Sequence, residues 1–473
     1  MRTLFLNPPS FDGFDGSAGA RYQARREIRS FWYPTWLAYP AGMVAHSRLL
    51  DASAQGMGVE EVMRQAHGYD LVILHTSTPT LANDAKVAES LKKHFPQLLV
   101  GFVGSHPTVL PEATLLGSKA VDFVSIGEFD YTVAEIAHGA PLERVEGIAY
   151  RSNGNILRTP PRPFIENLDA LPFVTEIYAR DLKPEDYFIG YLQHPYVSLY
   201  AGRGCRSRCT FCLWPQTISG HVYRVRSPQN LYDEMVGAKR LFPKVKEYFF
   251  DDDTFTDNPN VIEIARLMGR LGIVWSCNAR VSVSKETLKV LKENGLRLLV
   301  VGFESGNQKI LNNIKKGVRL DQARAFVKAA KELGILVHGT FVLGLPGETA
   351  ETIEETIRFA REIDPYSIQV SLAAPYPGTE LYEQAKKEGW LVKEGDRLVR
   401  EGIQDAVLSY GNLSSEEIFG AVDRFYRAFY LRTRPVLRIL GDMLRDRALF
   451  QRRVREGKEF FSFLAKRKEI TGE

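Results

Sequence analysis

The sequence predicts an α/β protein with three parts: an amino-terminal doubly wound, Rossmann-like domain, a central partial (β/α)6 barrel and a carboxyl-terminal helical segment. Short apolar runs alternate with amphipathic stretches over residues 1–145, and the same alternation returns over residues 191–388. From residue 389 the chain is charged and has helical periodicity only. Alternation of this kind is typical of parallel sheets covered by helices.

The first alternation predicts a parallel sheet with a ligand crevice. Polar or glycine-containing turns follow the apolar runs, and the carboxyl ends of such strands are where this fold binds ligands. A small hairpin is expected next, around the turn signal Ser152-Asn153-Gly154-Asn155, and a proline-rich connector follows at 160–172. The expected strands are residues 3–6, 69–74, 98–103 and 121–126. We place the domains at 1–145, 146–190 (hairpin and connector), 191–388 and 389–473.

The second alternation contains six strand-helix units, which predict a partial barrel of the β/α type. The expected strands are residues 196–201, 247–251, 273–277, 298–303, 337–343 and 368–373. The expected helices are residues 231–241, 261–271, 285–294, 320–333 and 352–363.

Bulk composition narrows the function classes. The 473 residues include 61 Lys and Arg against 57 Asp and Glu, and a net charge of +4 gives no reason to expect a nucleic-acid partner. No apolar stretch has the length of a membrane span or a signal peptide, so we expect a cytoplasmic protein. Three of the four cysteines lie within eight positions, which indicates a metal site rather than a disulfide framework.

The clustered cysteines directly follow the first expected barrel strand. Cys205, Cys209 and Cys212 are spaced to bind three corners of a cubane cluster and to leave one iron without a protein ligand. The plainer alternatives are a zinc site with a fourth ligand and a coincidence of cysteines. We expect Arg206 and Arg208 to ease the burial of the negative thiolates.

The other barrel strands end in polar or glycine-rich segments, where active-site residues of such a barrel lie. Taken singly, each segment is also explained as a solvated turn or a cap. The fourth cysteine, Cys277, is either a small core residue or a thiol facing the active site. The segments are residues 251–253, 276–280, 302–305, 344–348 and 375–378.

The cysteine spacing, with an aromatic residue before the last cysteine, resembles the signature of the radical S-adenosylmethionine (SAM) superfamily. The resemblance implies a [4Fe-4S] cluster, SAM as cofactor, and an external one-electron reductant such as flavodoxin or ferredoxin. It also implies contacts between the strand ends and SAM. Asp251, Asp252 and Asp253 would bind the amino group, Arg280 the carboxylate, Glu304 and Ser305 the ribose, and Gly344 and Pro346 the adenine, with Phe211 beside the cofactor and Cys277 and Tyr376 as candidate catalytic residues.

The amino-terminal domain resembles the cobalamin-binding domain of one branch of that superfamily, which makes cobalamin a candidate cofactor. The chain lacks the D-x-H-x-x-G pattern that supplies a histidine to cobalt. His75 and His106 follow expected strands, and each is either a cobalt ligand or a residue of the crevice. The rival interpretation is a retained fold that binds substrate or covers the barrel.

Nearly the whole chain is similar to the hopanoid-biosynthesis-associated radical SAM proteins, through residues 1–14, 29–37 and 213–216. This resemblance implies that a lipid-linked amino sugar is the substrate: the glucosamine head group of a bacteriohopanepolyol is rearranged to a five-membered cyclitol ether. Two alternatives stay open. One is a cobalamin-dependent methyltransferase or cyclase acting on another lipid or small molecule, and the other is a non-catalytic iron-sulfur or metal-binding protein.

Residues 425–468 mix aromatic and aliphatic positions with many Arg and Lys residues. A basic amphipathic helix of this kind binds to the surface of an anionic membrane. The alternative is a helix packed on the barrel with a solvated basic face. For a lipid substrate we expect peripheral contact with the inner face of the membrane.

Overall fold

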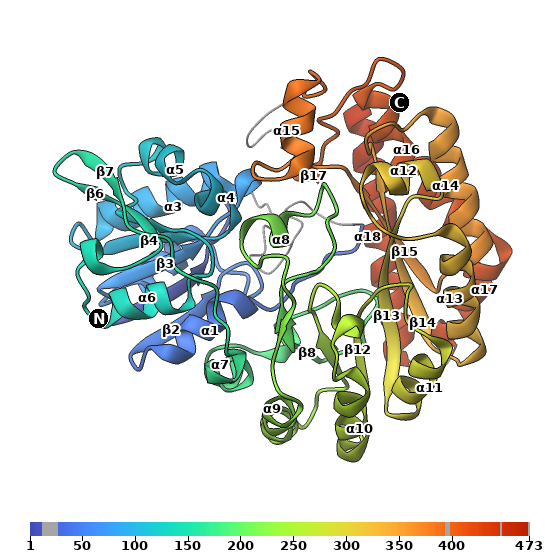
Figure 1. Ribbon diagram of the computed structural model, residues 1–473, viewed down its shortest axis with the longest axis horizontal. Helices are drawn as coiled ribbons and strands as arrows, with labels where there is room; N and C mark the ends of the chain where they lie inside the picture. Colours follow the sequence, from blue (N-terminus) through green and yellow to red (C-terminus); the bar gives the residue numbers. More distant parts are fainter. Residues whose placement is uncertain (12–26, 393–397, 445–446, 472–473) are drawn as a thin grey trace.

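The computed structural model describes residues 1–11, 27–392, 398–444 and 447–471. Two β-sheets lie side by side, and helix α8 (Leu213–Thr217) lies between them (Figure 1). The long carboxyl-terminal helices cover the far side of the second sheet (Figure 1). The three-part α/β architecture predicted from the sequence is confirmed.

The amino-terminal sheet has seven strands in the order β2-β1-β3-β4-β5-β6-β7. The first five are parallel, and β6 and β7 add an antiparallel hairpin at one edge. Every residue of β1 and β3 is buried, as expected for strands covered on both faces. The strands are β1 Thr3–Asn7, β2 Ser47–Asp51, β3 Leu71–His75, β4 Leu99–Val103, β5 Phe123–Ser125, β6 Ile148–Ser152 and β7 Asn155–Arg158.

Helices lie on both faces of this sheet (Figure 1). The nearby connector also forms one helix, α7, which packs against α1. The helices are α1 Thr35–Met43, α2 Val59–Gln65, α3 Leu81–His94, α4 Ser105–Val109, α5 Pro111–Gly117, α6 Asp130–Ala137 and α7 Val174–Asp181.

Two features of this sheet differ from the sequence prediction. Strand β2 was not predicted, because it is an edge strand whose first two residues, Ser47 and Arg48, are polar and half-buried. The predicted hairpin is present, but Tyr150 of β6 pairs with Phe123 of β5, so the hairpin extends the amino-terminal sheet. The division of the chain at residues 145, 190 and 388 stays a prediction.

The barrel sheet has six parallel strands in the order β8-β11-β12-β13-β14-β15, which confirms the predicted partial barrel. These strands are β8 Tyr196–Leu199, β11 Glu247–Phe250, β12 Trp275–Ala279, β13 Leu296–Glu304, β14 Leu336–Leu343 and β15 Ser367–Leu372. The helices of the barrel are α9 Pro228–Leu241, α10 Val261–Leu271, α11 Lys285–Glu293, α12 Gln308–Asn313, α13 Leu320–Glu332 and α14 Ala350–Ile363.

The carboxyl-terminal part protects the open edge of the barrel. Helix α16 (Ser415–Tyr430) begins at a capping box between Ser414 and Glu417 and lies against the edge strand β15. The hydroxyls of Tyr426 and Tyr430 accept hydrogen bonds from backbone N–H groups of β15, each at 2.9 Å. These bonds satisfy donors that an open sheet edge would otherwise expose. The remaining helices are α15 Glu380–Lys387, α17 Thr433–Met443 and α18 Arg447–Thr471.

Candidate active site

The loop with the three cysteines connects the two strands of a short antiparallel ribbon. Strands β9 (Gly202–Arg203) and β10 (Arg224–Val225) pair with each other, and the cysteines lie on the loop between them. Gly204 opens the loop with a φ of +93°, and a Cβ atom at this position would lie 2.2 Å from the carbonyl oxygen of Val222. Because only glycine tolerates both constraints, this residue sets the path of the chain into Cys205.

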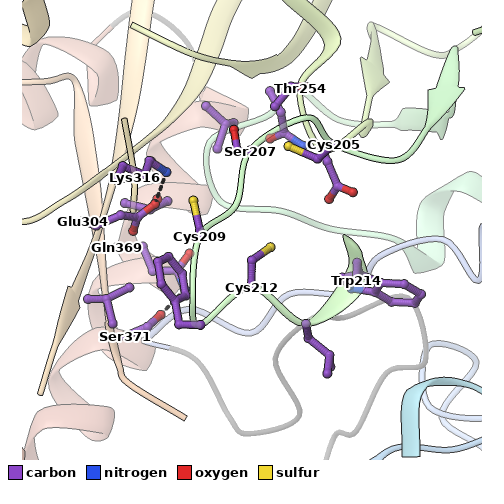
Figure 2. Close-up of a pocket in the computed structure, with 18 of the residues that line it drawn as sticks. Cys205, Ser207, Cys209, Cys212, Trp214, Thr254, Glu304, Lys316, Gln369 and Ser371 are labelled. Atoms are coloured by element: carbon purple, nitrogen blue, oxygen red, sulfur yellow. Dashed lines mark hydrogen bonds and ion pairs between the residues drawn. The ribbon is translucent and has the colours of Figure 1, made fainter. Parts of the chain in front are cut away.

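All three cysteines line one cavity of about 250 Å³ at the carboxyl ends of the barrel strands. Figure 2 shows their sulfur atoms on the loop, with Glu304, Lys316, Gln369 and Ser371 on the barrel side. Other predicted site residues that line the cavity are Phe211, Asp251, Asp253, Arg280 and Tyr376. The structure therefore brings most of the predicted site together.

The cysteines have the properties of cluster ligands. All three are thiols outside any disulfide that reach the cavity, with Cys205 and Cys209 buried and Cys212 half-buried. Burial raises the pKa of the Cys209 thiol, and the positive charges of Lys316 and Arg280 oppose that rise. The donor set, three soft sulfur ligands in one partly buried cavity, fits a [4Fe-4S] cluster.

The expected role of Arg206 and Arg208 is wrong, because both side chains are exposed to solvent. Lys316 is the cation that most strongly opposes the pKa rise of Cys209, and sequence reasoning did not identify it. Lys316 Nζ lies 2.6 Å from Glu304 Oε1, within the cavity wall. Glu304 itself has a φ of +62° next to an irregularity in the pairing of β13 with β14, so the backbone turns its carboxylate toward the cavity wall. A lysine beyond helix α12 carries no local signal that predicts this contact.

Arg280, Asp251 and Asp253 also line the cavity, and Arg280 donates to the carbonyl oxygen of Lys316 at 3.4 Å. The amide of Asn278 donates to Asp251 Oδ1 at 3.1 Å, and Arg280 lies 3.9 Å from the carboxylate of Asp257. Carboxylates and a half-buried guanidinium in one wall fit the amino and carboxylate groups of SAM.

Four residues predicted to contact SAM are outside the cavity lining. Asp252 is buried and accepts hydrogen bonds from the N–H groups of Ala201 and Gly202, at 3.1 and 2.5 Å. Ser305 is also buried, and its hydroxyl lies 3.1 Å from that of Thr356. Gly344 and Pro346 likewise do not line the cavity. Strand-end position predicted four of the five segments, in which neighbouring residues point in different directions, whereas no residue of 344–348 lines the cavity.

Cys277, a predicted catalytic residue, lies in the hydrophobic core. Its side chain is fully buried on β12, and it is absent from the cavity lining that the described residues form. Burial raises the pKa of this thiol well above its ordinary value. The structure therefore corrects the active-site interpretation, and the core interpretation of Cys277 holds.

The barrel adds a polar wall that sequence reasoning missed. Thr340 of β14 and Gln369 and Ser371 of β15 line the cavity, and Gln369 Nε2 donates to Ser371 Oγ at 2.9 Å. In β15 polar residues alternate with Ile368, Val370 and Leu372. This alternation places the two polar side chains on the inner face of the barrel. It is the sequence pattern from which the polar wall could have been predicted.

The strand ends of the amino-terminal sheet face the cluster loop. His75, at the end of β3, is buried and its ring is 6.4 Å from that of Trp214 on α8. Its Nε2 has no hydrogen-bond partner among the described residues, and burial lowers its pKa to about 4. His106 Nδ1 lies 3.0 Å from Thr78 Oγ1. A neutral imidazole whose Nε2 has no partner among the described residues can act as a metal ligand. This edge of the sheet is therefore compatible with cobalamin.

A buried ion network fixes the cluster loop to the amino-terminal domain. Arg203, two residues before Cys205, makes two hydrogen bonds to the carboxylate of Asp130, at 2.7 and 2.9 Å. Its guanidinium also lies 4.6 Å from the ring centres of both Trp36 and Tyr39. Arg224, the partner of Arg203 in the ribbon, donates to Glu128 at 2.8 and 2.9 Å. Both arms of the ribbon are thus attached to the segment that joins β5 and α6.

Comparison with known proteins agrees with this geometry. The model of the Radical SAM superfamily matches residues 199–360, and that of the B12 binding domain matches residues 24–137. An uncharacterized methyltransferase of Pyrococcus horikoshii is 31% identical over 93% of this chain and 94% of its own length. The chain is a radical SAM protein with a B12-binding domain. As a member of this superfamily it is an enzyme that uses a [4Fe-4S] cluster and SAM, and it requires an external reductant.

The radical SAM protein is also similar to a curated relative and to a solved structure. The hopanoid C-3 methylase of Methylococcus capsulatus is 28% identical over 86% of this chain and 78% of its own length. The solved structure of the radical SAM methyltransferase TsrM of Kitasatospora setae, with cobalamin and a [4Fe-4S] cluster bound, covers 100% of both chains with a TM-score of 0.65 at 14% identity. At that identity the likeness supports the fold. Within the described ranges, no helix has the length and apolar content to cross a membrane.

Proposed function

We propose that this radical SAM enzyme rearranges the glucosamine head group of a bacteriohopanepolyol to the cyclitol ether. The observation that carries the proposal is the polar barrel wall beside the cluster cysteines. Thr340, Gln369 and Ser371 offer hydroxyl and amide groups to a substrate rich in hydroxyl groups. The resemblance over residues 29–37 and 213–216 and the hopanoid named for one relative support the same substrate class.

The residues around the cavity divide into two groups by what they would hold. Cys205, Cys209 and Cys212 would bind the cluster, and Asp251, Asp253 and Arg280 would bind the amino acid part of SAM. Glu304, paired with Lys316, would contact the ribose. With both cofactors bound, the site is supplied with a 5'-deoxyadenosyl radical that abstracts hydrogen from unactivated carbon.

The barrel wall then has two tasks in the proposed reaction. Gln369, Ser371 and Tyr376 would orient the sugar, and the side chains around them would exclude water from the reacting carbon. The proposed place of action is the inner face of the membrane, where flavodoxin or ferredoxin delivers the electron.

Methyl transfer is the second candidate function. The B12-binding match, the neutral His75 facing the cluster loop and the methyltransferase names of the relatives favour it. The two functions differ in the product: a rearrangement leaves the mass of the substrate unchanged, whereas methyl transfer adds a methyl group and releases S-adenosylhomocysteine.

The deciding experiment is an anaerobic incubation of the reconstituted enzyme with SAM, a reductant and glucosamine-bearing bacteriohopanetetrol. We expect 5'-deoxyadenosine, formed only when the lipid is present, and a product of unchanged mass with a five-membered ring, since the product radical takes one further electron from the reductant and one proton. A methylated product would replace the proposal with methyl transfer. No change of the lipid, in a preparation that cleaves SAM, would reject the proposed substrate.

A pair of glutamine variants tests the role of the polar wall. Gln369→Leu should raise the KM for the lipid or lower product formation about tenfold, because one orienting amide of the cavity is lost. Gln229→Leu makes the same change in an exposed glutamine on α9 and should leave product formation unchanged. Equal activities of the two variants would contradict the assignment.

A further inference from the structure

Helix α17 carries an apolar stripe that faces solvent. Val436, Leu437, Leu440 and Leu444 are 41%, 61%, 48% and 87% exposed, and their spacing of three and four residues places them on one face of the helix. Figure 1 shows α17 on the outer side of the barrel helices. Single exposed apolar residues are common on proteins, but a run along one helix face indicates a binding surface.

Helix α17 is held firmly on its other face. The hydroxyl of Tyr366 donates to the carboxylate of Asp442, which also accepts from Arg453 at 2.8 Å. Arg432 donates to Asp364 at 2.7 Å, and Arg438 donates to the carbonyl oxygen of Pro365 at 3.2 Å. The stripe is therefore presented in a fixed orientation by contacts to the loop that precedes β15.

The exposed charged residues that are close to the stripe in the sequence are positive. Among the described residues of 431–458, the exposed charged side chains are the bases Arg434, Arg447, Arg455 and Lys458. The acidic side chains described there, Asp442 and Glu456, are buried in ion pairs with Arg453. A surface with apolar residues and positive charges complements an anionic lipid headgroup layer.

We propose that the α17 stripe is a docking surface for an anionic membrane. The leucines enter the boundary between headgroups and acyl chains, and the exposed bases Arg434 and Arg447 at the two ends of the stripe contact the lipid phosphates. A second copy of this chain is a poorer occupant, because a twofold contact through this face would bring two positive surfaces together. The inference rests on the membrane location given in the proposed function and names the surface that binds there, whatever the substrate.

The test is cosedimentation of the full-length reconstituted enzyme with vesicles of phosphatidylglycerol and phosphatidylcholine in roughly equal parts. We expect binding that weakens with salt and is absent from pure phosphatidylcholine vesicles. The double variant Leu437→Asp/Leu440→Asp should lower the partition coefficient at least about tenfold, since it removes apolar burial and adds negative charge. Leu116→Asp, which alters a 73% exposed leucine on α5, is the matched control and should bind as the parent does.

Three outcomes would overturn the surface assignment. They are absence of binding to anionic vesicles, equal binding by the double variant and the control, and a dimer of the parent protein that becomes a monomer in the double variant. Circular dichroism and cluster absorbance of each variant check that it is folded. SAM cleavage in detergent-dispersed lipid, measured in parallel, separates a failure of docking from a failure of the proposed reaction.

Discussion

Two regions of the molecule reverse the usual distribution of residues. One is the contact between the cluster loop and the amino-terminal domain, and the other is the outer face of α17. The first buries charges: Arg203, Asp130 and Glu128 have side chains that are 2% exposed or less. The second exposes leucines on a helix that is otherwise well anchored. Buried ions are costly unless fully paired, so they specify one geometry. Exposed leucines add little to folding, so we attribute their arrangement to binding.

The pairing of the buried ions also controls their protonation. Burial alone would raise the pKa of Glu128, but hydrogen bonds from Arg224 and the charge of Arg203 outweigh it and lower the pKa. Among the residues that the structure describes, Glu348 has no cation beside it and accepts only the N–H groups of Gly344 and Leu345, and burial raises its pKa to about 8. Two buried glutamates thus differ in charge because only one of them faces arginines.

The largest effect is expected at the ion network. Asp130→Ala leaves Arg203 buried with a single carboxylate contact, to Glu128 at 3.3 Å, and should destabilise the protein by about 3–5 kcal/mol. Glu112→Ala breaks a pair with Arg158 in which both side chains are about half exposed, and should cost less than about 1 kcal/mol. Urea unfolding followed by tryptophan fluorescence measures both. Equal losses would remove the distinction between the two kinds of ion pair.

A second effect is expected in the pH dependence of stability. The Glu348 carboxyl keeps its proton up to about pH 8 when folded, whereas its ordinary value is 4.5. Because the folded state binds the extra proton between these values, the stability falls as pH rises through that window, by about 1.4 kcal/mol per pH unit. Glu348→Gln should remove this slope, and the exposed control Glu332→Gln should retain it. Parallel profiles for Glu348→Gln and the parent would contradict the assignment.

The smallest effect is expected on α17. Leu440→Ala should change the stability by less than about 0.5 kcal/mol, because this exposed side chain is not packed in the core. Leu464→Ala on α18, where the leucine is 2% exposed, should cost about 2–5 kcal/mol. Thermal unfolding of the two variants provides the comparison. A large loss for Leu440→Ala would show that the stripe packs in the fold rather than serving as a binding surface.

Sequence patterns predicted the fold better than the details of the site. The apolar runs of both sheets were recognisable because parallel strands are buried on both faces, and β2 was missed because it is a polar edge strand. Cys205, Arg280 and Glu304 reach the cavity as predicted, since strand ends converge in a barrel. Lys316 was not predictable because it reaches Glu304 across the intervening helix α12, and the pairing of Arg203 with Asp130 was not predictable because it joins distant parts of the chain.

The central claim is that three cysteine ligands leave one iron of the cluster open to SAM. Electron paramagnetic resonance and electron-nuclear double resonance of the reduced, reconstituted enzyme with nitrogen-labelled SAM test it most directly. We predict a changed cluster signal and a hyperfine coupling to the amino nitrogen of SAM, both lost in Cys209→Ala. A signal that SAM leaves unchanged, or a preparation that holds zinc in place of the cluster, would contradict the claim.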